Sequence, residues 1–230
     1  MRRVMAVLFS LTFLMFPVRA VRGPKYVALT FDDGPSGKYT QALLDGLYDR
    51  GARATFLLCG YRLKDYPDIG QRIFDEGHEI GLHGYSHDSM KSMSRRTIAQ
   101  ELMDTEALLP EGCHPAFLRP PGGFSSDAVQ QVAQARGLAI LHWSVDPHDW
   151  QTHNQQAIEK AVLQQVKDGD IILLHDMTTS SVEAALVIVD ELLKQDYEFV
   201  TVSELARLRG IRPKPGTVYK KFPGQDGEIK

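Results

Sequence analysis

The sequence predicts an α/β fold, a distorted (β/α) barrel of about seven parallel strands in a single domain. Three observations predict it. From Tyr26 onward, short apolar runs alternate with amphipathic runs, which is typical of parallel strands joined by right-handed helical crossovers. The length of 230 residues suits one barrel better than two domains. Polar clusters follow five of the apolar runs, as they do at the carboxyl-terminal face of a (β/α) barrel.

The elements are expected in a regular order. Seven apolar runs are predicted as strands, at residues 26–31, 52–60, 78–83, 116–120, 138–145, 170–176 and 198–202. Helices are expected at residues 39–50, 69–76, 94–108, 127–136, 155–167, 182–194 and 203–209. In the first of them, Leu43 and Leu47 share one face and Gly51 closes the helix. Ser94 followed by Thr97 is a weak cap signal for the third.

The two ends of the chain differ from this pattern. Residues 1–20 begin with two arginines after Met1, continue in an uncharged apolar stretch from Val4 to Val18 and end in Arg19-Ala20, which predicts a signal peptide or an N-terminal membrane anchor. Both place the rest of the protein outside the cytoplasm, as a secreted, cell-wall or anchored protein. From Gly210 the chain becomes polar and rich in Pro and Gly. The barrel domain is therefore expected over residues 24–209 and a polar, extended or disordered tail over residues 210–230.

Composition limits the partners. Hydrophobic residues make up 43% of the chain, charged residues 24%, and the formal net charge is −3. This balance gives no reason to expect nucleic acid or an anionic membrane surface as a partner, and no protein partner is implied. Cys59 and Cys113 are expected near opposite ends of the barrel, as two free and mostly buried thiols.

The polar clusters lie where the predicted strands end. Asp32-Asp33 follow the first strand, His83 and His87 the third, residues 119–123 the fourth, residues 146–150 the fifth and His175-Asp176 the sixth. Since parallel strands of a barrel present their carboxyl ends at one face, we expect these segments to gather around one pocket.

A metal site is the first candidate within this pocket. His83 and His87 are four residues apart, a spacing that places two imidazoles on one helical face or turn. Two imidazoles with one carboxylate are a ligand set for Zn²⁺ or non-haem Fe²⁺. Neighbouring carboxylates raise each other's pKa unless a cation compensates them. A divalent cation that bound one carboxylate of Asp32-Asp33 would leave the other free as a base.

Five segments together resemble the motifs of a known family. Thr30–Pro35, His83–His87, Arg119–Gly123, Asp146–Trp150 and Leu173–Asp176 are similar, in this order, to the five motifs of the polysaccharide deacetylases, the NodB-homology domains of carbohydrate esterase family four. The resemblance runs from about Tyr26 to Leu208.

The resemblance implies a role for each matching residue. Asp32 would be the general base and Asp33 a metal ligand with His83 and His87. His175 would be the general acid, with its protonated form supported by Asp146. Arg119 would pair with Asp32, the main-chain amide of Gly122 would stabilise the oxyanion, and Trp150 and Leu173 would line the acetyl and sugar pocket. The metal would be divalent, with Zn²⁺ favoured over Co, Fe, Mn or Ni.

Two positions depart from the family pattern. The family usually has Ser or Thr where this chain has Gly84, and often Tyr where it has Gly122. Metal binding should survive the first change, whereas the second removes a side-chain wall and opens the pocket. Trp143 is expected in the core. Asp149 and Asp176 could each cap a turn or orient a histidine. Surface or turn positions are expected for His78, His114, His142, His148 and His153.

These expectations combine into one function with two alternatives. The favoured function is metal-dependent removal of N-acetyl groups from an N-acetylated glycan polymer, most favourably peptidoglycan or another N-acetylglucosamine polymer. An O-acetyl esterase that acts on a xylan-like polymer would use the same residues. A non-catalytic cell-wall-binding protein on the same scaffold remains the alternative outside the enzymes.

Overall fold

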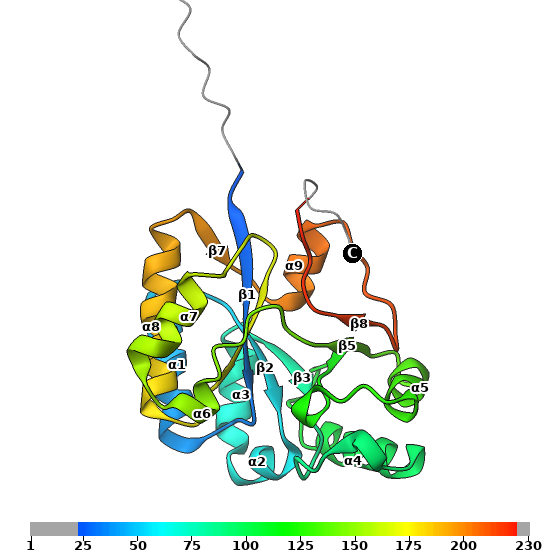
Figure 1. The fold of residues 1–230 in the computed structure, drawn as a ribbon. Helices are drawn as coiled ribbons and strands as arrows, with labels where there is room; N and C mark the ends of the chain where they lie inside the picture. The colour runs from blue at the N-terminus through cyan, green and yellow to red at the C-terminus, as the bar shows by residue number, and fades with distance from the viewer. Residues whose placement is uncertain (1–22, 225–230) are drawn as a thin grey trace, which may run out of the picture.

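A computed structural model describes residues 23–224 (Figure 1). The predicted signal peptide or anchor, residues 1–20, lies outside the described residues. The strands are β1 (Lys25–Asp32), β2 (Thr55–Leu58), β3 (Glu79–Leu82), β4 (Phe117–Leu118), β5 (Ala139–Leu141), β6 (Ile171–His175), β7 (Tyr197–Phe199) and β8 (Val218–Tyr219). They form one curled sheet in the order β6-β1-β2-β3-β4-β5-β8, with β7 paired to β1, and all the paired strands are parallel. The predicted distorted (β/α) barrel is confirmed.

Helices surround the curled sheet. They are α1 (Gly37–Asp49), α2 (Gly60–Asp65), α3 (Pro67–Asp75), α4 (Arg95–Glu106), α5 (Asp127–Ala135), α6 (Asp149–Thr152), α7 (Gln155–Leu163), α8 (Thr179–Leu193) and α9 (Val202–Leu208), with 3₁₀ turns at η1 (Met90–Ser92) and η2 (Pro121–Gly123). Side-chain caps fix several starts. The Ser94 hydroxyl accepts from the Thr97 N–H, as the sequence predicted. The Thr178 hydroxyl caps α8, which therefore starts at Thr179, before the start at residue 182 that the apolar pattern predicted.

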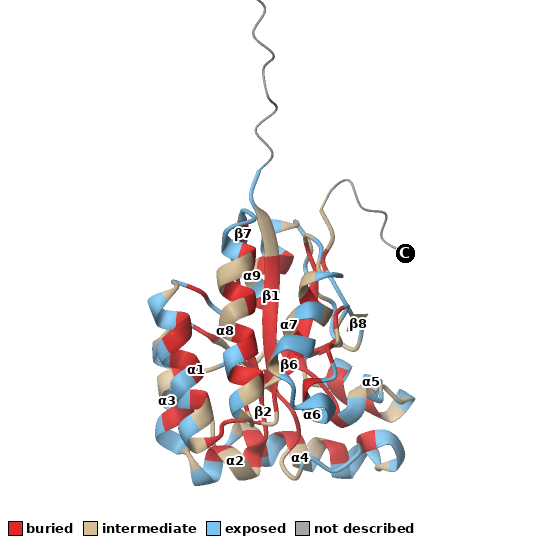
Figure 2. Ribbon diagram, turned by 60° about the vertical axis from the view of Figure 1, so that its left-hand side comes forward, coloured by how far each residue is buried: buried red, intermediate tan, exposed pale blue. Residues whose placement is uncertain are grey.

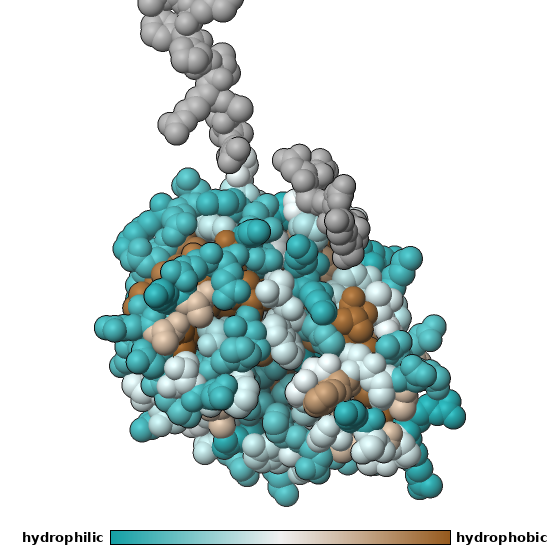
Figure 3. Space-filling model, viewed as in Figure 1, coloured by the Kyte–Doolittle hydropathy of each residue, from teal (hydrophilic) through white to brown (hydrophobic). Residues whose placement is uncertain are grey.

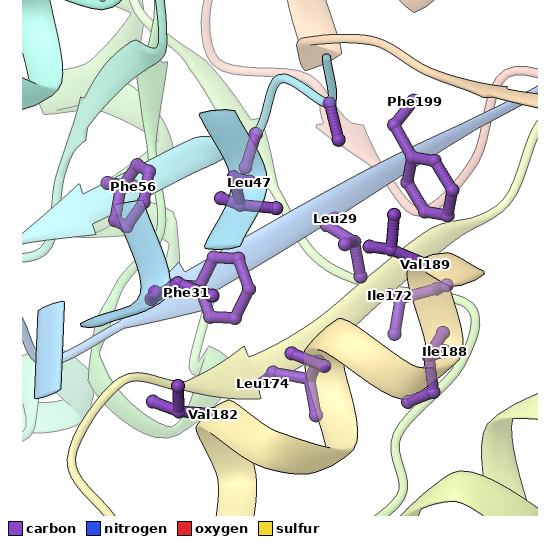
Figure 4. Close-up of a cluster of buried hydrophobic side chains, with 14 of the residues drawn as sticks. Leu29, Phe31, Leu47, Phe56, Ile172, Leu174, Val182, Ile188, Val189 and Phe199 are labelled. Atoms are coloured by element: carbon purple, nitrogen blue, oxygen red, sulfur yellow. The ribbon is translucent and has the colours of Figure 1, made fainter. Parts of the chain in front are cut away.

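Strand alternation separates the core from the site. On β1, Leu29 and Phe31 pack outward against α1 and α8, together with Ile172 and Leu174 of β6 (Figure 4). The intervening residues face the barrel interior. Asp32 therefore lies beside His175, and Thr30 beside Leu173, across the β1–β6 pair. The alternation that buries the apolar side chains on one face of the sheet thus directs Asp32 and His175 into the barrel interior on the other face.

The helices cover the sheet with their apolar faces. Figure 2 shows buried residues along the strands and along the inner sides of the helices, with exposed residues outside. The outer surface in Figure 3 is largely hydrophilic with scattered apolar side chains. Within residues 23–224, no helix combines the length and apolar character that a membrane crossing requires.

The C-terminal segment differs from the expected tail. Val218 and Tyr219 form β8 beside β5, and Phe222 is fully buried against the barrel interior. The Phe222 N–H donates to the Gly169 carbonyl at 2.8 Å. A Cβ at Gly169 would lie 2.2 Å from the Phe222 carbonyl oxygen, so the close approach requires glycine. Residues 211–222 thus belong to the domain and fill the wall between β5 and β6.

The fifth strand is shorter than expected. The prediction over residues 138–145 holds only for Ala139–Leu141, and Val145 returns to the sheet in a single bridge to Ile172. The carbonyls of Leu141 and His142 are bonded by the guanidinium of Arg119 instead of by a strand partner. This detour carries Trp143 out of the ladder and into the lining of the pocket.

Candidate active site and metal centre

The paired aspartates stand at the end of β1. Asp33 has a left-handed backbone, with φ of 72°, so the chain leaves the strand conformation there. Alternation would otherwise send the two neighbouring side chains to opposite faces. With this turn, both Asp32 and Asp33 line the same pocket.

Three side chains form a cluster that could hold a metal ion. The ligand atoms of Asp33, His83 and His87 all lie within 4.8 Å of one another. Asp33 Oδ1 is 3.3 Å from His83 Nε2 and 3.0 Å from His87 Nε2. Burial would raise the pKa of Asp33, but the close contacts with the two histidines and their charges outweigh it and hold that pKa well below its usual range. For His87, the contact with Asp33 outweighs burial and raises the pKa.

The chemistry of this cluster fits a divalent cation. His83 Nδ1 donates to the Arg119 carbonyl at 2.6 Å, so Nε2 is the ring nitrogen that faces Asp33 and could bind a metal. Asp33 Oδ1 is buried and has no hydrogen-bond partner of good geometry among the described residues. A carboxylate and two imidazole lone pairs that face one another repel unless a cation lies between them. These are the residues that would hold the metal.

A half-buried carboxylate fixes the loop that carries the two histidines. Glu101 of α4 accepts from the N–H groups of Tyr85 and Ser86 at 2.8 and 2.9 Å, and from the Ser86 hydroxyl. Gly84 has φ of 82°, which favours glycine. Glu101 and Ser86 therefore brace the loop where the family pattern has a hydroxyl at position 84. The sequence pattern did not single out Glu101.

Arg119 is paired with Asp32 as expected. The arginine is fully buried, and its Nη1 donates to Asp32 at 2.6 Å and to the Thr30 hydroxyl at 2.8 Å. Its Nε donates to the Leu141 carbonyl and its Nη2 to the His142 carbonyl, so each nitrogen of the guanidinium has a hydrogen-bond partner. Asp32 is thereby held in one orientation, 3.7 Å from His83 Nε2.

The acid candidate His175 has a different partner from the one expected. Its Nδ1 lies 2.8 Å from Asp149 Oδ1, and its main-chain N–H donates to Asp149 Oδ2 at 2.9 Å. Burial lowers the pKa of His175, but the hydrogen bond that its ring donates to Asp149 and the charges of the nearby aspartates raise it to about 9. The expected support from Asp146 is wrong. Asp146 accepts from the His148 N–H and shapes the turn that leads into α6, where Asp149 begins the helix.

Asp176 holds the turn that follows Asp33 and does not orient a histidine. Its carboxylate accepts from the Thr40 hydroxyl, and its carbonyl accepts from the Ser36 hydroxyl. A Cβ at Gly34 would lie 2.6 Å from Asp176 Oδ1, so the glycine admits the carboxylate against the turn. Burial raises the pKa of Asp176 to about 7.

One pocket joins these groups. It has a volume of about 340 Å³ and its lining includes all the predicted site residues except Arg119, which lies behind Asp32. Gly122 and Leu173 lie in its wall, and Trp150 is 55% exposed beside it. Trp143, which was expected in the core, also lines the pocket. His148 is exposed, as expected, and contributes to the pocket lining from that position. His78 is buried, where its Nδ1 accepts from the Ala54 N–H.

Trp143 has two roles that its alternating position concealed. It packs against the interior cluster and also stacks over the Arg119 guanidinium, 5.6 Å from the ring centroid. No sequence signal marked it as a pocket residue, because the apolar pattern extended the predicted strand through Val145. Cys59 and Cys113 are free, as expected.

Comparisons with known proteins agree with this site. The family model described as polysaccharide deacetylase matches residues 19–141. The chain belongs to the polysaccharide deacetylase family. The predicted resemblance is thus confirmed.

Individual members of the family cover most of the chain. A peptidoglycan-N-acetylglucosamine deacetylase of Bacillus cereus is 38% identical over 80% of this chain and 90% of its own length. The peptidoglycan-N-acetylmuramic acid deacetylase PdaC of Bacillus subtilis is 35% identical over 82% of this chain, which spans 40% of that longer protein. Among solved structures, a family 4 acetyl xylan esterase from Clostridium thermocellum, in complex with a cobalt ion, has a TM-score of 0.81 and 35% identity. That match covers 86% of this chain and all of that one.

Proposed function

We propose that this protein removes N-acetyl groups from an N-acetylated polysaccharide in a metal-dependent hydrolysis, with peptidoglycan as the substrate. The observation that carries the proposal is the convergence of the Asp33, His83 and His87 cluster with Asp32 and His175 in one pocket. As a member of the polysaccharide deacetylase family, the chain is a hydrolase that deacetylates a polysaccharide. The peptidoglycan deacetylases among its relatives support the substrate.

A divalent metal bound by Asp33, His83 and His87, with Zn²⁺ as our proposal, would polarise the acetyl carbonyl and make water a nucleophile near neutral pH. Asp32 lies beside this cluster and is oriented by Arg119, so it can accept the proton of the attacking water. The main-chain amide of Gly122 is the proposed donor to the developing oxyanion.

The departing sugar nitrogen needs a proton, because an amide expels a poor leaving group. His175 lines the same pocket and is held by Asp149 in a form that is protonated at neutral pH. Trp150 and Leu173 are the proposed walls for the sugar and the acetyl methyl. The products are acetate and a free amine.

The test is acetate release from purified peptidoglycan. His87→Ala should lose most of its activity at limiting Zn²⁺, and excess Zn²⁺ should restore it only in part. His114 is exposed, remote from the pocket lining and suited to the control variant His114→Ala. Equal activity of His87→Ala and the control at every metal concentration would refute the mechanism.

An O-acetyl esterase is the second candidate, because the acetyl xylan esterase of Clostridium thermocellum is similar over its full length. An ester leaves without a general acid. His175→Ala should therefore reduce N-acetyl hydrolysis far more than O-acetyl hydrolysis in the same protein. If the wild-type protein hydrolyses acetylated xylan and no N-acetylated glycan, the esterase is correct. If it binds peptidoglycan but releases no acetate from either substrate, the non-catalytic alternative is correct.

The proposed substrate places the protein outside the cytoplasm. Residues 1–20 would then act as a cleaved signal peptide or as a retained membrane tether. N-terminal sequencing of the protein recovered from the cell wall and from the membrane fraction would distinguish the two.

A further inference from the structure

The space beside Gly122 is filled by the side chain of another residue. Gly122 lies in the lining with the metal cluster, and its φ is 68°. A Cβ at this position would lie 2.9 Å from Cε2 and 3.2 Å from Cδ2 of Phe124. The Phe124 ring thus occupies the direction in which a side chain at position 122 would project.

The local backbone holds this ring in place. Gly123 has φ of 73°, and a Cβ there would lie 2.8 Å from Cη2 of Trp143. The two glycines therefore let the chain turn tightly between two aromatic rings, Trp143 on one side and Phe124 on the other. Phe124 remains 45% exposed, so much of its surface is free at the rim of the pocket.

A cation lies beside the exposed ring. The ammonium of Lys91, from η1, is 5.3 Å from the Phe124 ring centroid. Lys194 is paired with Glu191 at 2.6 Å, whereas within residues 23–224 no carboxylate lies within 4.0 Å of the Lys91 ammonium. The positive charge at this rim is therefore available to an incoming anion.

We propose that Phe124 and Lys91 form a specificity subsite for the sugar that adjoins the N-acetylated one, and that this sugar carries a carboxylate. The inference rests on the proposed function and narrows it. The apolar C–H face of a sugar ring would bury area against Phe124, and the carboxylate would pair with Lys91. A neutral N-acetylglucosamine oligomer uses the first contact alone. Peptide-free peptidoglycan strands, whose muramic acid residues carry free carboxylates, use both.

The test compares these two glycans as substrates. Lys91→Met keeps the apolar stem and removes the charge. We expect it to raise KM for peptide-free peptidoglycan by about 5–10-fold, the size of effect expected when one solvent-exposed polar contact is lost. Its KM for neutral N-acetylglucosamine oligomers should stay within about twofold, and kcat should be little changed for both glycans, because Lys91 does not touch the reacting atoms. Lys91→Arg should retain the preference.

Phe124→Ala should raise KM for both glycans by several-fold. Two matched controls are available, since Tyr48 is 74% exposed on α1 and Lys160 is exposed on α7, and neither lines the pocket. Tyr48→Ala and Lys160→Met should leave both KM values unchanged. If Lys91→Met changes both KM values equally, or neither, the subsite is overturned.

A binding measurement separates this proposal from the function on which it rests. Calorimetric titration of the metal-free protein with peptide-free peptidoglycan strands needs no turnover. Weaker binding by Lys91→Met than by Lys91→Arg would support the subsite even if no acetate were released, in which case the proposed function alone would fail. Equal binding by the two variants would overturn the subsite while the deacetylase activity stood.

Discussion

The Asp149 carboxylate bonds His175 twice, once at the imidazole Nδ1 and once at the main-chain N–H. The two contacts fix both the ring and the strand end that carries it. They direct Nε2, the other ring nitrogen, into the pocket that His175 shares with Asp32 and Asp33. The Asp149 carboxylate occupies Nδ1 and thus leaves Nε2 as the ring nitrogen that can donate a proton to the substrate.

Asp149→Asn should lower the pKa of His175 from about 9 toward the ordinary histidine value of 6.5, because the raising contact is weakened while burial remains. The imidazole would then be mostly neutral at pH 8. NMR titration of the metal-free protein measures the midpoint directly. We expect N-acetyl hydrolysis at pH 8 to fall by up to about 30-fold, in proportion to the fraction of His175 that is protonated and can act as the general acid.

Asp146→Asn is the matched control for this variant. Asp146 bonds the His148 backbone and not His175, so the His175 midpoint should stay near its wild-type value. A large shift of that midpoint in Asp146→Asn, with none in Asp149→Asn, would contradict the assignment.

Glu101→Ala should weaken metal binding without unfolding the protein. Its carboxylate holds the main chain between the two metal histidines, so its loss frees the loop that positions them. Losing a residue that orients metal ligands typically lowers metal affinity by about 10–100-fold. Titration with Co²⁺, followed by visible absorption, measures this affinity. Asp104→Ala, on the exposed side of the same helix, should leave it unchanged.

Asp176→Asn should stabilise the metal-free protein at alkaline pH. The folded-state pKa of Asp176 is raised from 3.8 to about 7, so the native state disfavours the charged carboxylate. The stability that the protonated group contributes is present below about pH 4 and is lost as pH rises through 7. The amide keeps the shape and cannot ionise. Its Tm advantage over wild type should grow between pH 5 and pH 8, and a constant difference would argue against a buried titrating group.

Phe222→Ala should destabilise the fold by about 3–5 kcal/mol, the usual range when a buried aromatic side chain is lost. The reason is that the fully buried ring fills the interior between β5 and β6. Chemical denaturation measures the loss. Leu208→Ala, at a residue that is 39% exposed, is the control and should cost far less. Similar losses in both variants would mean that the C-terminal segment adds little to the domain.

Most of the fold could be predicted because its signals are periodic. Apolar alternation on β1 and β6 determines which residues face the interior, and the parallel order then gathers Asp33, His83 and His87 at one end. The pairing of Arg119 with Asp32 followed from the family pattern and is confirmed.

The predictions were wrong at positions where the local path of the backbone determines where a side chain points. Asp146 and Asp149 stand in the same short segment, and only the turn into α6 determines which of them meets His175. The polar composition after Gly210 concealed the isolated apolar residues Val218 and Phe222, which complete the wall of the barrel. Trp143 alternates like a core residue, but the detour around Arg119 turns it toward the pocket.

Because Phe222 completes the interior, the order of synthesis matters for this domain. The ribosome still encloses residue 222 when β1 to β7 have emerged. Until that residue emerges, the apolar interior between β5 and β6 of the nascent chain stays exposed to water. A chain truncated before this residue would contain all the residues of the metal cluster but would lack the ring that seals the wall between β5 and β6.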